Sequence, residues 1–94
     1  MSVTFEFDPE KSAANFAKHG IDFEMAQSLW DDADRVEGDA RSEDEPRARI
    51  TGMVDAKLWS AFVTVRGNNI RIISVRRARE NEVRLYERKN DKRR

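Results

Sequence analysis

The chain has 94 residues, enough for one domain that folds alone but too few for a deep cofactor-binding domain. It contains no cysteine, which excludes a disulfide framework, a thiolate nucleophile and a sulfur-ligated metal. The formal net charge is zero, but residues 1–55 hold 6 Lys and Arg against 14 Asp and Glu (−8), whereas residues 56–94 hold 12 against 4 (+8). The second half therefore suits an anion such as a nucleic acid. The alternative is that the two halves neutralise each other within one small fold.

The chain carries no targeting or membrane signal. No apolar run approaches the roughly 20 residues of a membrane span. Residues 1–10, MSVTFEFDPE, lack the basic and apolar regions of a signal peptide. We therefore expect a cytoplasmic protein with a single domain over residues 1–94 and no cofactor.

The first twenty residues predict a strand and a helix. Residues 4–7 alternate apolar and polar side chains as a short strand does. Asp8 is a good N-cap and Pro9 a good first helical residue, so a helix should begin there. It should end near His19, because Gly20 can take the left-handed conformation that closes many helices.

Three further segments precede the basic half. Asp22 can cap a second helix that ends near residues 31–32. Residues 35–39 predict a brief, weak strand. Residues 39–46, DARSEDEP, are polar and acidic without periodicity, which predicts a mobile loop.

The second half predicts three consecutive antiparallel strands and a helix. The strands are expected at residues 47–54, 58–65 and 70–77. Turns at residues 55–57 and 67–69 should join them. A last helix should span residues 78–89, followed by a frayed basic tail over residues 90–94. The elements predict an α+β fold, with a small antiparallel sheet of three to four strands, two N-terminal helices and one C-terminal helix.

Arginines crowd the last strand and the start of the last helix. Strand alternation places Arg76 on one face with Ile72, whereas Arg71 and Arg77 share the other face, so they cannot all line one site without a bulge or a twist. A guanidinium group binds a phosphate through two hydrogen bonds and stays charged at any working pH. The alternative is a solvated arginine paired with an acidic residue. The candidates for phosphate binding are Arg49, Arg71, Arg76, Arg77 and Arg79.

Four side chains are candidates for moving protons at such a site: Lys18, His19, Glu82 and Tyr86. Histidine is the natural proton shuttle among the side chains, although a histidine that ends a helix, as His19 is predicted to do, can simply favour the helix dipole. Glu82 and Tyr86 lie four residues apart on one helix face, where they would meet a phosphate held by Arg76. The alternative is that Tyr86 packs the helix on the sheet and Glu82 pairs with an arginine.

Metal-dependent and covalent chemistry are disfavoured. The chain has one histidine, and the acidic residues 43–45 lack a recognisable ligand spacing, so we expect no metal site. A nucleophilic triad has no anchor either. RNA can be cut without either, when a base deprotonates the 2′-OH, cations stabilise the crowded phosphate and an acid protonates the leaving oxygen. Trp30 and Trp59 are candidates for base stacking, but we favour packing in the core or at an interface.

A set of motifs spread over almost the whole chain is specific in combination. The motifs are Phe5-Glu6-Phe7-Asp8-Pro9, Lys11, Asn15, Lys18-His19-Gly20, Phe23 and Ala26, then Arg71-Ile72-Ile73-Ser74, Arg76-Arg77-Ala78, Glu82 and Tyr86-Glu87. Together they resemble the BrnT toxins of bacterial type II toxin–antitoxin systems, whose fold is related to the RelE-type ribonuclease toxins.

The resemblance implies mRNA cleavage that arrests growth and inhibition by a neighbouring BrnA-type antitoxin. It also implies that the complex contacts operator DNA only through the antitoxin, and it is compatible with a homo-oligomer within that complex. Two other interpretations remain open from the residues alone. One is a non-catalytic module that binds nucleic acid or an acidic protein through the basic half, and the other is a subunit that is stable only within a hetero-complex.

Overall fold

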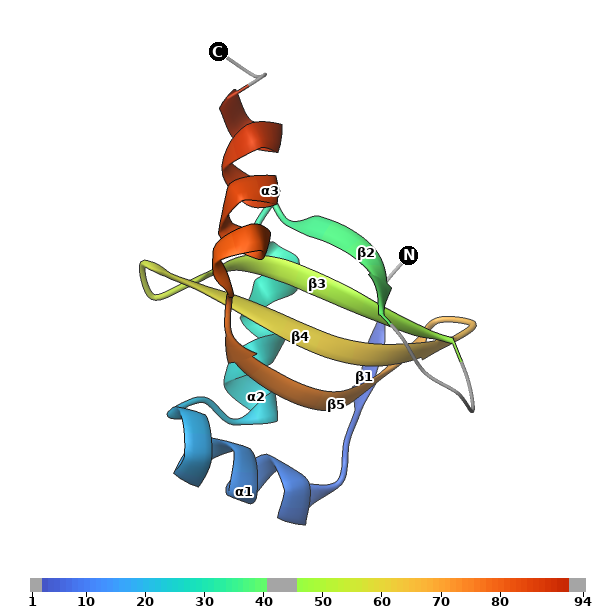
Figure 1. Ribbon diagram of the computed structural model, residues 1–94. Coiled ribbons are helices and arrows are strands. Elements are labelled where there is room, and N and C mark those ends of the chain that lie inside the picture. The colour runs from blue at the N-terminus through green and yellow to red at the C-terminus, as the bar shows by residue number, and fades with distance from the viewer. Residues whose placement is uncertain (1–2, 41–45, 92–94) are drawn as a thin grey trace.

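A computed structural model describes residues 3–40 and 46–91 of the chain, and within them three α-helices, one short 3-10 helix and one five-stranded sheet are found (Figure 1). The elements in chain order are β1 (Thr4–Glu6), α1 (Pro9–His19), α2 (Phe23–Ala26), the 3-10 helix η1 (Gln27–Asp31), β2 (Val36–Ala40), β3 (Arg47–Val54), β4 (Lys57–Arg66), β5 (Asn69–Arg77) and α3 (Glu80–Asp91). The α+β class is therefore confirmed.

The sheet differs from the predicted one in strand number and direction. Its order is β1-β5-β4-β3-β2, so it has five strands rather than three to four. It is mixed, because β1 runs parallel to β5 while all other pairs are antiparallel. The physical reason is that β1 and β2 are short edge strands, and β1 pairs with β5, about 65 residues further along the chain. Local alternation predicts such strands but cannot assign their neighbours.

The predicted helix caps are confirmed. Asp8 accepts a hydrogen bond from the Glu10 amide at 2.9 Å, and Gly20 takes a left-handed φ of 82° at the end of α1. Asp22 accepts a hydrogen bond from the Met25 amide at 2.7 Å. The second helix is shorter than predicted, because after one α-helical turn the chain tightens into η1.

Two predicted segments fall partly outside the described residues. Of the acidic segment 39–46, residues 39 and 40 end β2, and residues 41–45 are outside the description. Of the tail 90–94, residues 90 and 91 extend α3, and residues 92–94 are outside it. The structure therefore corrects the bounds of both predictions, because residues 39–40 belong to a strand and residues 90–91 to a helix, and it leaves them untested for residues 41–45 and 92–94.

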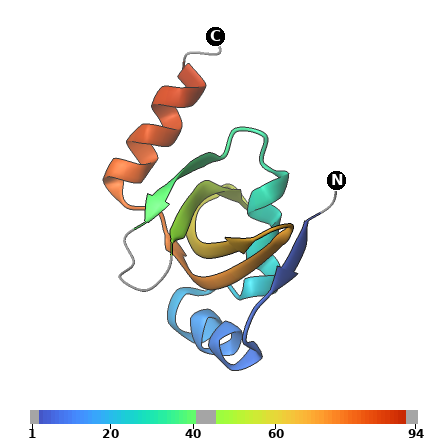
Figure 2. The same cartoon turned by 90° about the vertical axis from the view of Figure 1, so that its right-hand side faces the viewer.

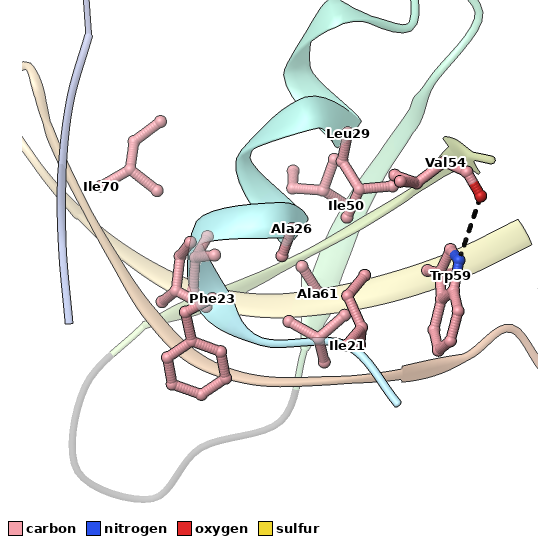
Figure 3. Close-up of a cluster of buried hydrophobic side chains, with 12 residues drawn as sticks. Ile21, Phe23, Ala26, Leu29, Ile50, Val54, Trp59, Ala61 and Ile70 are labelled. Atoms are coloured by element: carbon pink, nitrogen blue, oxygen red, sulfur yellow. Dashed lines mark hydrogen bonds between the residues drawn. The ribbon is translucent and has the colours of Figure 1, made fainter. Parts of the chain in front are cut away.

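The hydrophobic core lies between the sheet and the helices α1, α2 and η1. Phe23, Ala26 and Leu29 pack from the helices onto Ala61 and other buried strand residues (Figure 3). Trp59 is 8% exposed and donates from its indole nitrogen to the Val54 carbonyl at 3.3 Å, as the core interpretation predicted. Helix α2 lies behind the sheet, whereas α3 leaves the sheet on the opposite side (Figures 1 and 2). One face of the sheet is therefore covered by the core and the other carries polar side chains.

A buried asparagine completes the edge of β5 beyond the end of β1. Strand β1 pairs only with Asn69 to Arg71, so the backbone of Val75 has no strand partner on that side. Asn15 of α1 takes that place, because its side-chain amide donates to the Val75 carbonyl at 2.9 Å and accepts from the Val75 amide at 3.2 Å. The same amide donates to the Ile21 carbonyl at 2.8 Å. One side chain therefore satisfies three backbone groups and holds α1 against the sheet.

We predict that Asn15→Ala lowers the free energy of unfolding by about 2–4 kcal/mol, because it leaves buried backbone donors and acceptors of Val75 and Ile21 unpaired. Urea denaturation monitored by circular dichroism measures the change. Lys11→Ala, at an exposed position of the same helix, should change stability by no more than about 0.5 kcal/mol. Equal stability of the two variants would contradict this account of Asn15.

Candidate functional site

The face of the sheet opposite the core carries a polar and basic surface, which we call the open face. Strand pairing arranges its side chains in three rows across β3, β4 and β5. One row joins Thr51, Ser60 and Arg76, and the next joins Arg49, Phe62 and Ser74. The third row contains Thr64 and Arg71, with Arg47 at the adjoining position of β3.

A β-bulge brings arginines together that strict alternation separates. Phe62 pairs with Ser74 while Val63 pairs with Ile72, so Ile73 is the extra residue in β5. Arg71 pairs with Thr64 and Arg76 pairs with Ser60, which places both on the open face. The prediction that Arg71 and Arg76 lie on opposite faces is therefore wrong. The rule that alternate residues of a strand share a face fails here, because the bulge inserts one residue between Arg71 and Arg76.

The carboxylate of Glu82 is the centre of the hydrogen-bond network on the open face. Its Oε1 accepts from Arg76 at 2.9 Å, from Ser60 at 2.8 Å and from the Arg79 amide at 2.9 Å. Its Oε2 accepts a second hydrogen bond from Arg76 at 2.9 Å, so the two side chains form a bidentate pair. The contact with Arg79 is half of a capping box, because Glu82 is the third residue of α3.

Hydrogen bonds keep Glu82 ionised although its side chain is only 4% exposed. Burial by itself raises the pKa of a carboxyl group. The hydrogen bonds from Arg76, Arg79 and Ser60 outweigh burial and lower the pKa of Glu82 to about 2. Glu82 is therefore a carboxylate at any working pH, and its two oxygens accept four hydrogen bonds.

Arg49 reaches the same network from β3. Its Nε lies 4.0 Å from Oε2 of Glu82, an ion pair without a hydrogen bond. Across the sheet its guanidinium lies over Gly38 of β2, where a Cβ atom would be 2.9 Å from Nη2. The absence of a side chain at Gly38 thus leaves the space that this guanidinium fills. A cation–π contact also holds Arg76 in place, because its guanidinium lies 4.9 Å from the centroid of the Phe62 ring.

Tyr86 faces an acidic partner rather than the arginines. Its hydroxyl donates to Oδ2 of Asp32 at 2.8 Å, and the same oxygen accepts from the Met53 amide at 2.8 Å. Burial and the hydrogen bond to Asp32 raise the pKa of Tyr86 to about 12. The hydroxyl therefore joins α3 to the residues that follow η1, as the packing interpretation of Tyr86 predicted.

The other candidate arginines lie away from the Glu82 network, and one of them is on the opposite side of the sheet. Arg71 forms an ion pair with Glu6 at 3.5 Å, and both side chains are near two-fifths exposed. Arg77 points to the core side, where its guanidinium lies 5.4 Å from the centroid of Trp59. Arg79 is exposed at the start of α3.

Lys18 and His19 lie at the end of α1, away from the Glu82 network. Within the described residues, no hydrogen bond or ion pair connects either side chain to the candidate arginines. Gly20, the next residue, lines a groove of about 140 Å³ that also includes Trp59. The end of α1 therefore lies at the same end of the sheet as Trp59 and the Arg77 stacked on it.

Sequence reasoning missed several residues of the open face, among them Arg47, Ser60, Phe62 and Thr64. Ser60 and Phe62 read only as part of an apolar strand, and Arg47 as a solvated strand residue. The available signal was the alternation of Ser60, Phe62 and Thr64 along β4, which marks the face away from the core. Their neighbours became visible only through the register of the sheet.

Two further properties concern metals and membranes. Among the residues that the structure describes, no three His, Asp or Glu side chains are grouped so as to hold a metal ion. No helix in the described part of the chain is long and apolar enough to cross a membrane.

Comparison with known proteins identifies one family. The family model for the ribonuclease toxin BrnT of type II toxin–antitoxin systems matches residues 7–82. The matched segment runs from the end of β1 to Glu82 and so includes every strand of the open face. No curated protein matches the chain.

We predict that wild-type stability falls as the pH drops from about 5 to 2. A folded-state pKa of about 2, below the usual 4.5, gives stability that is present above pH 4.5 and lost as Glu82 is protonated. The loss amounts to at most about 3 kcal/mol. Glu82→Gln lacks the carboxylate, so at pH 7 it should already be less stable than the wild type by this amount. Urea denaturation at a series of pH values measures the difference. Glu87→Gln, an exposed change in the same helix, serves as the control. If Glu82→Gln loses as much stability in acid as the wild type does, the loss belongs to other carboxyl groups.

Proposed function

The chain belongs to the BrnT family of ribonuclease toxins of type II toxin–antitoxin systems, and we propose that it is a metal-independent endoribonuclease that cleaves mRNA at the open face. The observation that carries this proposal is the buried carboxylate of Glu82, which orders two open-face arginines beside an aromatic ring. Such a surface fits single-stranded RNA, whose phosphates need cations and whose bases stack on flat side chains.

Arg49 and Arg76 are the proposed partners of the scissile phosphate. In metal-free cleavage the 2′-oxygen attacks the adjacent phosphorus, and the bond to the 5′-oxygen of the next nucleotide breaks. The products are a 2′,3′-cyclic phosphate and a free 5′-hydroxyl. Negative charge accumulates on the phosphoryl oxygens in the transition state, where fixed guanidinium groups stabilise it most. Glu82 acts as a positioning residue, because it fixes the Arg76 fork and attracts Arg49.

The proton transfers require a different group from Glu82 or Tyr86. A general base or acid works best when its pKa is close to the operating pH. The pKa values of about 2 for Glu82 and about 12 for Tyr86 are far from neutrality, and both side chains are already hydrogen bonded. We therefore assign the proton carrier to His19, with Lys18 as its cationic neighbour. Both lie at the end of α1, on the side of the sheet that carries Trp59 and Arg77 and not on the open face, so the His19 variant below tests whether this end of α1 reaches the scissile phosphate.

The proposed biological setting follows from the family. A type II toxin has an antitoxin partner and, as a ribonuclease toxin, an RNA substrate. We propose that the partner is a BrnA-type antitoxin encoded beside the toxin, and that operator DNA is contacted only through it. Free toxin would then degrade mRNA in the cytoplasm and arrest growth until the antitoxin is resupplied.

We predict that the purified protein cleaves single-stranded RNA in EDTA and leaves 2′,3′-cyclic phosphate ends. Arg49→Ala should lower kcat by about 100-fold, as expected for the loss of one transition-state donor. Arg84→Ala, which changes an exposed arginine paired with Glu80, is the charge-matched control and should retain full activity. Loss of cleavage in EDTA would refute the metal-free route, and salt-sensitive RNA binding without cleavage would favour a binding module.

We predict that His19→Gln lowers kcat by about 100-fold, the contribution expected of a positioned general acid or base. His19 is the chain's single histidine, so no other imidazole can take over this role. Mass spectrometry of the cleavage products measures the rate between pH 5 and 9, and antitoxin binding reports whether the variant is folded. A variant that keeps the wild-type rate across this pH range would exclude His19 as the proton carrier.

A further inference from the structure

A hydroxyl group on the open face is buried without a partner. Thr64 is 2% exposed, and its Oγ1 makes no hydrogen bond within the described residues. Leaving a buried hydroxyl unpaired costs on the order of 1–3 kcal/mol, so such groups are rare in folded proteins unless water or a ligand serves them. Thr51, on the same face, shows the usual arrangement, because its hydroxyl bonds to Ser60 at 2.7 Å.

Two arginines flank this hydroxyl. Arg71 of β5 is paired with Thr64 in the sheet register. On the other side Ala48 pairs with Val63, which places Arg47 beside Thr64. The Nε of Arg47 is also buried and has no hydrogen-bond partner among the described residues. Three neighbouring groups can therefore donate to the same acceptor, and two of them have no acceptor in the part of the chain that the structure describes.

The local charge at this row differs from that at the Glu82 network. The Arg71 contact with Glu6 is a single one at 3.5 Å between two side chains that are 41% and 43% exposed. An ion pair of that kind contributes little and exchanges easily with another anion. Arg76, by contrast, is held by two short hydrogen bonds to a buried carboxylate. The Thr64 row is thus the end of the open face whose arginines are available to an external anion.

Spacing along β4 makes this row a separate position from the proposed cleavage site. Ser60 bonds to Glu82, and Thr64 lies four residues further along the same strand. At about 3.3 Å per residue the two positions are about 13 Å apart. A single phosphate cannot bridge that distance. Phe62 lies between the two positions on the same face, with its ring half-buried.

We propose that Arg47, Thr64 and Arg71 form a second phosphate subsite, which binds a backbone phosphate of the RNA away from the scissile one. The Thr64 hydroxyl donates to a phosphate oxygen, and the two guanidinium groups neutralise its charge. The RNA segment between the two phosphates passes over Phe62 and the Arg76 guanidinium that lies on its ring, which together offer a flat surface to a base. The protein therefore recognises a stretch of several nucleotides of single-stranded RNA. The subsite rests on the proposed function for its ligand, RNA.

Binding of a 2′-O-methyl RNA octanucleotide tests the subsite independently of cleavage, because this probe lacks the attacking hydroxyl. Thr64→Val should weaken its affinity about tenfold, as expected for loss of a hydrogen bond to a charged group. Thr64→Ser keeps the hydroxyl and should bind within about twofold of the wild type. Arg71→Ala should reduce the slope of log K against log salt by about 0.7, the contribution of one phosphate contact on a single strand.

Thermal unfolding separates binding from folding in the same variants. Thr64→Val removes an unpaired hydroxyl, so its Tm should equal or exceed that of the wild type. Thr51→Val removes a paired hydroxyl and should lower the Tm. If Thr64→Val fails to fold, the salt slope of Arg71→Ala decides alone. Equal losses of affinity in the Val and Ser variants, wild-type affinity in Thr64→Val, or an unchanged salt slope in Arg71→Ala would overturn the subsite.

Cleavage assays distinguish failure of the subsite from failure of the proposed function. A dinucleoside monophosphate occupies only the scissile position, so Thr64→Val should cleave it at the wild-type rate. Cleavage of an octanucleotide should fall about tenfold in kcat/KM. An equal loss on both substrates would refute a separate subsite. A wild-type protein that binds the octanucleotide but cuts neither substrate would refute the proposed function and leave the binding test of the subsite intact.

Discussion

The arrangement of the open face depends on one buried carboxylate. Glu82 binds Arg76 through both oxygens, accepts a hydrogen bond from Ser60 of β4 and caps the start of α3. One side chain thus joins a helix and two strands that are separated in sequence. The desolvation of a buried ion pair offsets much of its attraction, so we attribute to Glu82 the fixing of geometry more than a gain in net stability.

Two irregularities of β5 set the geometry around this carboxylate. The bulge at Ile73 rotates the second half of the strand, so that Arg71 and Arg76 share a face. Asn15 then satisfies the exposed edge at Val75, where β1 no longer pairs. Together they let a strand with a buried apolar side present two arginines to the same surface.

The open face combines ordered and available cations. Near Glu82 the guanidinium of Arg76 is fixed, which suits the stabilisation of charge that develops during a reaction. Near Thr64 the arginines have weak partners or none within the described residues, which suits the binding of an RNA chain that must also leave. The difference follows from the burial of the acidic partner, because Glu82 is 4% exposed beside Arg76 whereas Glu6 is 43% exposed beside Arg71.

The sequence by itself determined the elements whose signals are local. The caps Asp8, Gly20 and Asp22, the three long strands and the last helix follow from residue type and periodicity, and the motifs identified the family. Only the tertiary structure decided which partner each side chain meets. Glu82 and Tyr86 are four residues apart in one helix, yet one lies against arginine and the other against Asp32, and their pKa values move in opposite directions. Periodicity fixes the face of an element, but register, bulges and the packing of distant segments fix its neighbours.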